Sequence, residues 1–251
     1  KRYNNFEINL QESKKDNEII NVIIQLSDEQ KNIVKKINIQ GNTITEEKVI
    51  RDNLVLSEGD YLNQLKIKRS IDNVKATQIF GKVDYKIEDS DAKNFKDLNL
   101  FVKEQATGSI SAGVGYGTNG GLLEASINEK NFLGQGINFN FTGQLSAEKI
   151  SGEIGYIDPN FKNSNKELAT YIYSESDDYS NTGYQNKRVG TKIATKYEIY
   201  EDVYFRPNLG LQYDNLEVGA STSSLLKSRE GSFKTLSVGY NFSFDKRDSR
   251  F

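Results

Sequence analysis

The sequence predicts two parts: an α+β module in the first hundred or so residues, then about eight antiparallel strands with the features of a transmembrane β-barrel. Apolar residues recur at helical spacing only before Glu104, and after Gly108 polar and apolar residues alternate with a period of two. Many alternating stretches reach about nine residues, which a tilted strand needs to cross a bilayer. Short turns and long polar loops connect them in rough alternation, a pattern typical of outer-membrane barrels.

The composition excludes several classes of function. The chain has 251 residues, with 33 basic and 35 acidic side chains and no His, Cys, Met or Trp. Without His or Cys it has no catalytic triad or cysteine nucleophile of the usual kind, and no zinc or haem site of the usual ligand type. The net charge of −2 also lacks the basic excess that nucleic-acid binding requires. We therefore predict no catalytic residues, no metal, no cofactor and no nucleic-acid partner.

The α+β module begins with a strand and a helix. Residues 34–39 alternate as a half-buried strand, which Gly41 ends. Thr43 and Glu46 have the spacing of a capping box, in which each side chain bonds to a backbone amide at the start of a helix. The helix that follows carries Val49 and Ile50 on one face. These signals predict a β-α unit over residues 34–54.

A second helix and two more strands complete this module. The helix is expected over residues 63–77, with Leu65, Ile71 and Val74 directed inward and the basic side chains outward. Strands are expected at residues 83–87 and 98–102. The module over residues 33–104 therefore has the order β-α-α-β-β.

The start of the chain repeats the end of this module. Residues 6–10 and 22–26 are strand-like and enclose a polar stretch, like the hairpin before Glu104. We expect residues 1–32 to be the C-terminal hairpin of a preceding copy, since such repeats occur in arrays. Residues 105–251 are then the first eight strands of a truncated barrel. Because the sequence does not begin with Met, we expect a mature form or an excised fragment.

Alternation assigns a face to each residue of the strands. Small residues of the first strand share one face, and modest apolar residues share the other. The small residues are Ser109, Ser111, Gly113 and Gly115, and the apolar residues are Ile110, Ala112, Val114 and Tyr116. In later strands we expect Ile193 and Leu211 to face lipid, and Lys192 and Gln212 to face the interior. A soluble β-sandwich shows the same alternation, so that fold remains an alternative.

One glycine pattern matches the dinucleotide-binding fingerprint. Gly115, Gly117 and Gly120 follow G-x-G-x-x-G, which requires a strand before it and a helix after it to hold the pyrophosphate. A second alternating strand follows here instead. The glycines therefore predict a tight hairpin rather than a nucleotide site.

Several motifs, in order along the chain, resemble the BamA family of outer-membrane β-barrel assembly factors. Residues 37–42, with the two helices behind them, resemble a POTRA domain, the periplasmic repeat of that family. Residues 102–108 and the glycines at 113 and 115 resemble its junction between POTRA and barrel and its first barrel strand. Residues 131–136 and 158–161 resemble the turns that follow, and residues 245–248 resemble the end of the eighth strand. The resemblance extends over nearly the whole chain.

The resemblance implies a non-enzymatic machine in the bacterial outer membrane, with its POTRA part in the periplasm. It would insert unfolded outer-membrane protein clients into lipid with the help of accessory lipoproteins. Clients would pair as an added strand with POTRA edges and with the first barrel strand, here Ser109, Ile110, Ser111, Ala112, Gly113, Val114 and Gly115. A lipoprotein-contacting Arg-Arg-Glu patch of the family corresponds here to Arg51, Asp52 and Asn53, where the carboxylate is shifted or lost. The family barrel has sixteen strands, twice as many as are predicted here.

Two other functions remain open at this point. One is a related POTRA-bearing transporter, either a two-partner secretion pore or an autotransporter assembly factor, which sequence beyond both ends of this chain would distinguish. The other is a soluble β-rich binding protein with a small α/β module, which would remain soluble without detergent. An enzyme is disfavoured because the usual catalytic side chains are missing.

Overall fold

The computed structural model describes residues 6–14, 20–28, 32–117, 120–179, 183–220 and 222–246. The chain divides into two compact units. The first comprises Lys1–Asn42, Asn53–Lys75 and Phe80–Lys103, and the second comprises Thr43–Asp52, Ala76–Ile79 and Glu104–Phe251. The segment that carries the first helix therefore belongs with the long strands of the second unit. In the described part of the chain, no helix has the length and apolar character needed to span a membrane.

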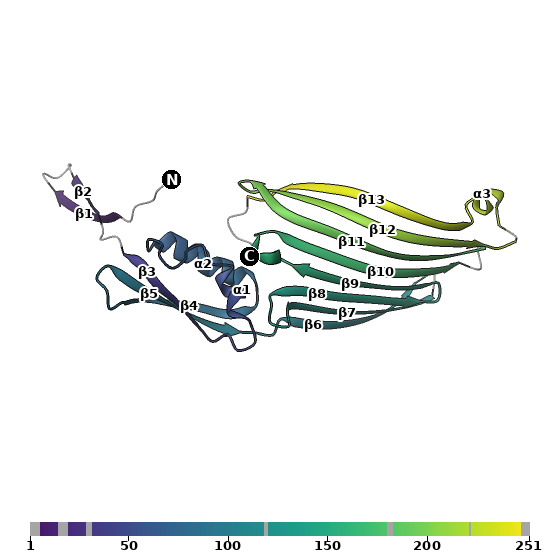
Figure 1. The fold of residues 1–251 in the computed structure, drawn as a ribbon, viewed down its shortest axis with the longest axis horizontal. Coiled ribbons are helices and arrows are strands. Elements are labelled where there is room, and N and C mark those ends of the chain that lie inside the picture. Colours follow the sequence, from purple (N-terminus) through teal and green to yellow (C-terminus); the bar gives the residue numbers. More distant parts are fainter. Residues whose placement is uncertain are drawn as a thin grey trace. The chain divides into compact units, whose positions relative to one another are not determined.

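A three-stranded sheet and one helix form the body of the first unit (Figure 1). Its elements are β3 (Ile33–Gln40), α2 (Gln64–Ala76), β4 (Phe80–Asp89) and β5 (Phe95–Glu104). The order in the sheet is β3-β5-β4, and β3 runs parallel to β5. The most deeply buried side chains of its core are aliphatic and at most 2% exposed, namely Val34, Ile37, Leu56, Ile67, Val74, Leu98 and Leu100. The predicted strands of the module are confirmed.

Helix α2 confirms its predicted position and the predicted burial of Ile71 and Val74, but not that of Leu65. The side chain of Asn63 caps the helix, because its Oδ1 accepts hydrogen bonds from the backbone amides of Leu65 and Lys66. The buried stripe consists of residues at helical spacing, namely Ile67, Ser70, Ile71 and Val74. Leu65 was expected inside but is 58% exposed, because it lies off this stripe in the first turn.

The two predicted strands at the start of the chain form an antiparallel hairpin. They are β1 (Phe6–Lys14) and β2 (Ile20–Asp28), paired from Phe6 opposite Asp28 to Lys14 opposite Ile20. They form a sheet of their own. Their origin in a preceding module remains a prediction.

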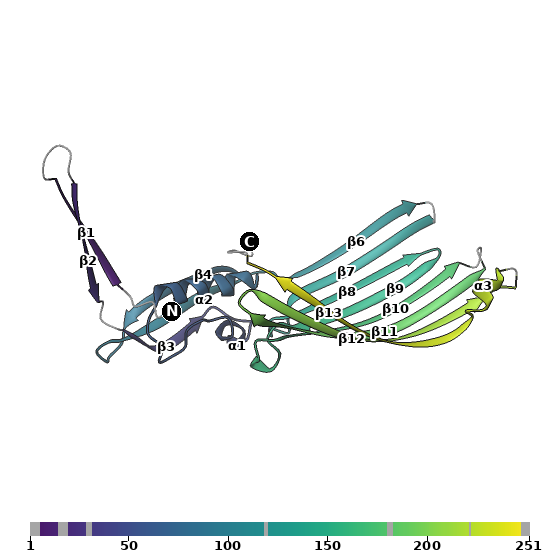
Figure 2. The same ribbon diagram turned by 90° about the horizontal axis from the view of Figure 1, so that it is seen from above.

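Eight antiparallel strands form the sheet of the second unit, as predicted. They are β6 (Gly108–Gly117), β7 (Gly120–Phe132), β8 (Ile137–Ser146), β9 (Lys149–Asp158), β10 (Glu167–Tyr179), β11 (Tyr184–Tyr200), β12 (Val203–Val218) and β13 (Gly231–Phe244). Each strand pairs with the next along the chain, so β6 and β13 lie at the two ends of the sheet. Figure 2 shows that the sheet is curved. Three short helical elements accompany it: α1 (Glu47–Arg51), η1 (Phe161–Asn163) and α3 (Ser224–Lys227).

The register gives this sheet one polar face and one apolar face. A row across all eight strands on the polar face runs Ser111, Ser126, Thr142, Glu153, Tyr173, Gly190, Gln212, Thr235. The next row, on the apolar face, runs Ile110, Ile127, Phe141, Ile154, Ile172, Thr191, Leu211, Leu236. Ile193 shares the apolar face and Lys192 the polar face, so the predicted division of these four residues between two faces is confirmed. That the apolar face meets lipid stays a prediction.

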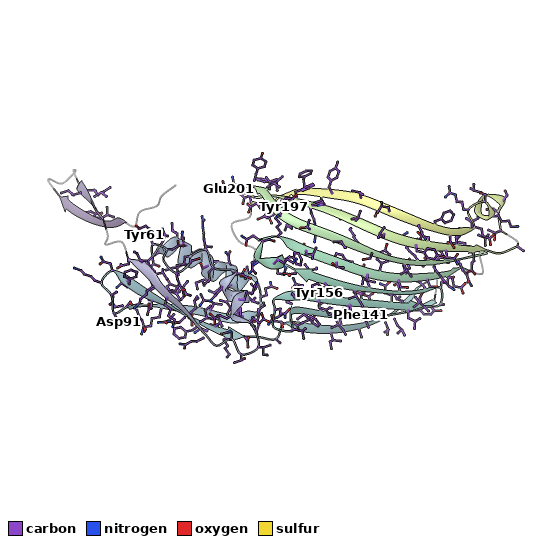
Figure 3. The ribbon with its side chains drawn as sticks, in the orientation of Figure 1. Tyr61, Asp91, Phe141, Tyr156, Tyr197 and Glu201 are labelled. Atoms are coloured by element: carbon purple, nitrogen blue, oxygen red, sulfur yellow. The ribbon has the colours of Figure 1, made fainter. Side chains whose placement is uncertain are left out.

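Aromatic side chains gather on the apolar face. Figure 3 labels three of them: Phe141 on β8, Tyr156 on β9 and Tyr197 on β11. Near the short turn between β11 and β12, the ring of Phe205 lies 5.8 Å from that of Tyr197 and 4.7 Å from that of Phe242. Aromatic rings near strand ends are typical of the girdles at membrane interfaces.

Part of one sequence motif lies outside the described residues. Of residues 245–248, which resemble the end of an eighth barrel strand, Arg247 and Asp248 are not described. Asp245 follows β13, and its backbone amide donates to the carbonyl oxygen of Asp202 at 2.9 Å.

Candidate functional site

The candidate site is β6, the strand at one end of the large sheet. All seven residues that the sequence singles out, from Ser109 to Gly115, lie in this strand, and every residue of the strand is exposed. Only β7 pairs with β6, so its other backbone edge has no neighbouring strand in the described part of the chain. An edge of this kind presents unpaired N–H and C=O groups that can hydrogen-bond a further strand.

Small side chains leave β6 with few lateral contacts. On the polar face, the hydroxyl oxygens of Ser111 and Ser126 lie 2.7 Å apart. A Cβ atom added to Gly113 would meet no atom within 4 Å. On the apolar face, Ile110 and Val114 are more than 80% exposed. A partner of this strand would therefore be bound mainly by backbone hydrogen bonds.

The end of β5 holds a loop that precedes α1. The Glu104 carboxylate accepts hydrogen bonds from the Thr43 hydroxyl at 2.6 Å and from the backbone amides of Thr43, Ile44 and Thr45 at 2.7 to 3.2 Å. Burial raises the pKa of Glu104, but these hydrogen bonds outweigh it and lower the pKa from the usual 4.5 to about 2. The carboxylate is therefore ionised at neutral pH and binds three consecutive amides of the loop.

This geometry corrects the predicted capping box. Glu46 is the N-cap residue of α1, and no side chain caps the helix. The Thr43 hydroxyl donates to Glu104 instead of accepting a hydrogen bond from the helix. The prediction was wrong because the spacing of Thr43 and Glu46 could not reveal a carboxylate 61 residues away in sequence.

Asn131 joins the same loop to the turn between β7 and β8. Its Nδ2 donates to the Thr45 hydroxyl at 2.9 Å, and its Oδ1 accepts from the backbone amide of Gly136 at 2.8 Å. The Asn131 side chain is buried, as is that of Thr45. The backbone amide of Glu46 also donates to the carbonyl oxygen of Gly134 at 2.8 Å. The loop and the turn are thus joined by hydrogen bonds that are shielded from water.

Two glycines allow this turn to approach the loop closely. A Cβ atom on Gly134 would lie 2.2 Å from the carbonyl oxygen of Ile44, and one on Gly136 would lie 2.8 Å from the Val49 side chain. Both glycines have positive φ, as does Leu133 at 56°. Positive φ is unfavourable for a branched residue such as Leu, so packing around the turn must maintain this conformation.

A network of charges crosses the polar face at four strands. Lys149 pairs with Glu175 at 2.9 Å, Glu175 with Arg188 at 3.5 Å, and Arg188 with Asp214 at 3.0 Å. The ring of Tyr173 lies over Gly190, and its hydroxyl donates to Gln212 at 2.7 Å. These contacts hold β9 to β12 together in one register. Sequence reasoning missed them, because alternation shows which residues share a face but not which residues lie opposite each other.

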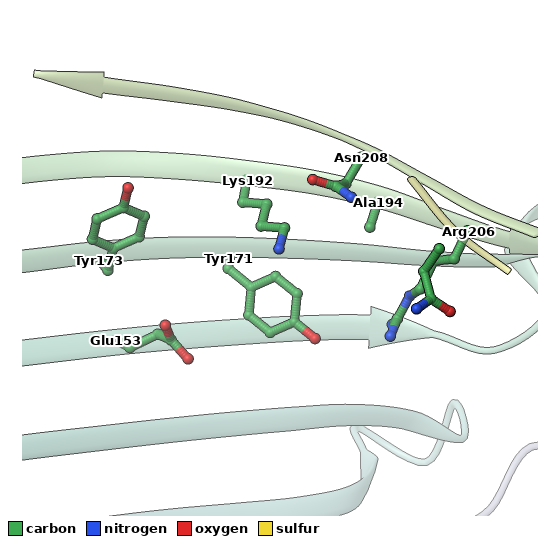
Figure 4. A pocket seen from close by; sticks show the side chains of 8 residues that line it. Glu153, Tyr171, Tyr173, Lys192, Ala194, Arg206 and Asn208 are labelled. Carbon is green, nitrogen blue, oxygen red and sulfur yellow. The ribbon is translucent and has the colours of Figure 1, made fainter. Parts of the chain in front are cut away.

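A polar cavity of about 490 Å³ lies beside this network. Figure 4 shows its lining side chains, which come from neighbouring strands. The lining residues are Glu153, Tyr171, Tyr173, Lys192, Ala194, Arg206, Asn208 and Asn241. Arg206 pairs with Glu167 at 2.5 Å. The cavity has the polar lining expected of a barrel interior.

The residues predicted to contact a lipoprotein lie at the C-terminal end of α1 and directly after it. Arg51 donates to Glu47 at 2.7 Å, and Asp52 pairs with Lys48. The carbonyl oxygen of Asn53 accepts from Asn73 at 3.2 Å. The charges of Arg51 and Asp52 thus each have a partner one helical turn away, and nothing in the structure tests the proposed contact.

Comparison with protein families identifies two matching domains. Residues 32–105 match the POTRA family, described as a surface antigen variable number repeat, and residues 131–251 match the Omp85 superfamily domain. Outer membrane protein assembly factor BamA of Nitratidesulfovibrio vulgaris is 24% identical over 92% of this chain. BamA of Buchnera aphidicola is 33% identical over 41% of it. The chain spans 29% and 17% of the lengths of these two relatives.

Solved structures show the same fold. The crystal structure of BamA from Haemophilus ducreyi lacking POTRA domains 1–3 aligns with 98% of this chain and 51% of its own length, at a TM-score of 0.76 and 19% identity. CdiB from Escherichia coli aligns with 95% of this chain and 46% of its own length, at a TM-score of 0.56 and 13% identity. Residues 32–105 thus match a POTRA domain and residues 131–251 an Omp85 superfamily domain, and together with the BamA relatives they identify the chain as a BamA-type fragment, with its POTRA domain in the periplasm and its strands in the outer membrane.

Proposed function

We propose that this protein assembles β-barrel proteins into the outer membrane by pairing client strands with β6. Unfolded clients reach the periplasmic side, add a strand to the exposed edges of the POTRA sheet, and then pair with Ser109–Gly115. The observation that carries the proposal is that β6, the first strand of the sheet, has only serine and glycine on its polar face and few side-chain contacts, in a chain of the BamA type. The protein acts as a template and catalyses no covalent step.

Backbone hydrogen bonding and lipid supply the driving force. An unpaired N–H or C=O group costs several kcal/mol in hydrocarbon, so a client strand gains most by pairing before it enters the bilayer. The edge of β6 offers this pairing at the membrane, and the client's own strands can then follow one another along the growing sheet. Neither step requires a nucleotide or a cofactor.

The proposal includes accessory partners and a longer chain. Arg51, Asp52 and Asn53 form the contact with an assembly lipoprotein, with a weaker charge pattern than the family's Arg-Arg-Glu. Residues 1–32 form the last hairpin of a preceding POTRA domain, 33–104 a complete one and 105–251 the first eight barrel strands. The apolar face of the sheet, with Ile193 and Leu211, contacts outer-membrane lipid.

Proline substitutions along β6 test the proposal in the full-length protein. Successive N–H groups of a strand point alternately to its two edges, so one of Gly113→Pro and Val114→Pro removes a bond to β7 and the other removes a donor from the free edge. We expect the variant that loses a bond to β7 to disrupt the sheet. We expect the variant that loses a donor from the free edge to stay folded but to block assembly of a radiolabelled client in proteoliposomes. Val114→Ile, which keeps the N–H, is the control and should retain activity. Full activity of both proline variants would refute the proposal.

A second candidate is secretion of a partner protein. The likeness to CdiB supports it, because the fold of that protein covers nearly the whole chain. The BamA relatives and the higher TM-score of the BamA structure favour assembly. Proteoliposomes separate the two functions: assembly leaves a client protease-resistant in the membrane, whereas secretion delivers it to the far side.

A further inference from the structure

The base of β6 is held more firmly than the rest of the strand. Glu129 on β7 lies opposite Gly108, the first residue of β6, and a Cβ atom on Gly108 would lie 2.7 Å from a carboxylate oxygen of Glu129. The other carboxylate oxygen accepts from the backbone amide of Asn131 at 2.7 Å. Glu129 thus pairs with the first residue of β6 in the sheet, and its carboxylate lies close to that residue and binds the Asn131 amide.

Asn131 lies in an irregular stretch of β7. The pairing of β7 with β8 shifts by one residue between Glu129 and Phe132, which is a β-bulge. A bulge interrupts the alternation of side chains and re-aims one of them. Within this irregular stretch, the side chain of Asn131 bonds to Thr45 and to the Gly136 amide. Hydrogen bonds thus run from Glu104 through the loop at residues 43–46 to Asn131 and Glu129, and Glu129 pairs with Gly108 at the base of β6.

Toward its other end, β6 loses these attachments. In the described part of the strand, the last side-chain hydrogen bond is that between Ser111 and Ser126. Further along, Gly113 and Gly117 contribute no side chain, and Tyr116 is 90% exposed. The strand is therefore anchored at Gly108 and held mainly by its backbone pairing with β7 beyond Ser111.

The side chains of such a strand specify only weakly the register in which a client strand pairs with it, and a fixed base can restrict that register. Register between strands is set by side-chain patterns, and it is weakly specified where a strand is rich in glycine. The polar face of β6 carries only serine and glycine, so a client strand could pair two residues further along or further back at little cost. A fixed base limits this slippage, because it gives every client strand the same starting point.

We infer that Asn131 and Glu129 are positioning residues that set the register in which a client strand pairs with β6. The inference rests on the proposed function and adds a role for residues that touch no client. Glu104 and Thr45 support these residues from the loop. We call Glu104, Thr45, Asn131 and Glu129 the clamp. The clamp fixes the base of β6 at Gly108, while the part of β6 beyond Ser111 pairs with the client.

Removal of one hydroxyl group is the sharpest test. Thr45→Val keeps the shape of the side chain but removes the hydroxyl that accepts from Asn131, whereas Thr45→Ser keeps the hydroxyl. Asn131→Ala removes both bonds of the side chain. Its control, Asn160→Ala in the β9–β10 turn, also removes a 2.8 Å bond to a backbone amide but lies away from the clamp.

The readout is the register of a stalled client on the full-length protein. Photocrosslinkers at Ser109, Ser111 and Gly113 report which client residue lies opposite each position. We expect one dominant client residue per position in wild type, Thr45→Ser and Asn160→Ala. In Thr45→Val and Asn131→Ala we expect at least half of the adducts to move by two residues, in a sheet that remains folded although the lost hydrogen bonds lower its melting temperature.

Each outcome decides a different claim. A single register in Thr45→Val and Asn131→Ala would overturn the inference and leave the proposed function standing. Absence of client adducts on β6 of the wild-type protein would refute the proposed function, and the inference with it. If Asn131→Ala fails to fold, Thr45→Val decides the matter, since it leaves the bond between Asn131 and Gly136 in place.

Discussion

A single arginine at Leu211 tests whether the apolar face of the sheet meets lipid. Leu211 is near the middle of β12, opposite Thr191 on β11 and Leu236 on β13, and its side chain is 55% exposed. Arginine at the bilayer midplane of a barrel costs about 2–4 kcal/mol. A cost of this size lowers the folding equilibrium constant by about 30-fold to about 700-fold. We therefore expect Leu211→Arg to be severely destabilised in a membrane.

The control must lie at the same depth on the polar face. Gln212 is unsuitable, because it accepts a hydrogen bond from Tyr173 at 2.7 Å and donates one to Asp214 at 2.6 Å, and each is worth about 0.5–1.5 kcal/mol. Thr235 lies opposite Gln212 on β13 and is exposed, and no hydrogen bond of its side chain occurs among the described residues. We expect Thr235→Arg to change the stability by less than about 0.5 kcal/mol.

Urea titration of the full-length protein in phospholipid vesicles measures both variants. Folded and unfolded forms are separated by their different mobility on unheated gels, and the midpoints give the two changes in free energy. A difference of at least about 2 kcal/mol between Leu211→Arg and Thr235→Arg supports the orientation. Equal stability of the two variants would refute it, because one of the two faces would then not contact hydrocarbon.

Three further predictions concern single contacts. Gly134→Ala places a Cβ atom 2.2 Å from the carbonyl oxygen of Ile44 at a φ of +77°, so we expect thermal unfolding to show a loss of about 1–3 kcal/mol in the free energy of unfolding. In the control, Gly121→Ala, the Cβ atom meets nothing within 4 Å and the stability should not change. Hydrogen bonds lower the pKa of folded Glu104 to about 2, so its contribution to stability should be complete above pH 4.5 and be lost as the pH falls toward 2. Amide exchange in the loop at residues 43–46 should therefore accelerate over this pH range. The Glu104→Gln variant should show no such acceleration. Gly190→Ala brings a Cβ atom within 2.4 Å of the Tyr173 ring and should lower the urea midpoint, and recovery in a double variant with Tyr173→Ala would assign the loss to this contact.

Local pattern was sufficient for much of this protein. The period of two predicted eight strands and the face of each residue, because pleating is a property of every strand by itself. The helical spacing of apolar residues likewise predicted where α2 lies, and Asn63 caps this helix within its own first turn. The candidate strand at Ser109–Gly115 was predictable for the same reason, since its small residues recur at every second position of one short segment.

The clamp at the base of β6 was not predictable in this way. Asn131 and Thr45 are 86 residues apart, and Glu104 and Thr43 are 61 apart. The capping box was a wrong prediction because Thr43 had a better partner in space than in sequence. The register shift between Glu129 and Phe132, where Asn131 lies, also breaks the alternation from which the faces were predicted.

The sequence by itself thus determined the elements and their faces, and the tertiary structure determined which residues lie opposite each other. The physical reason is that periodicity is set by bonds along one chain segment, whereas register depends on which distant backbone and side-chain groups find hydrogen-bond partners. In strands rich in glycine and serine, many registers bury similar amounts of apolar surface. Contacts such as that of Tyr173 with Gly190 and Gln212 select one register, and they exist only once the strands have come together.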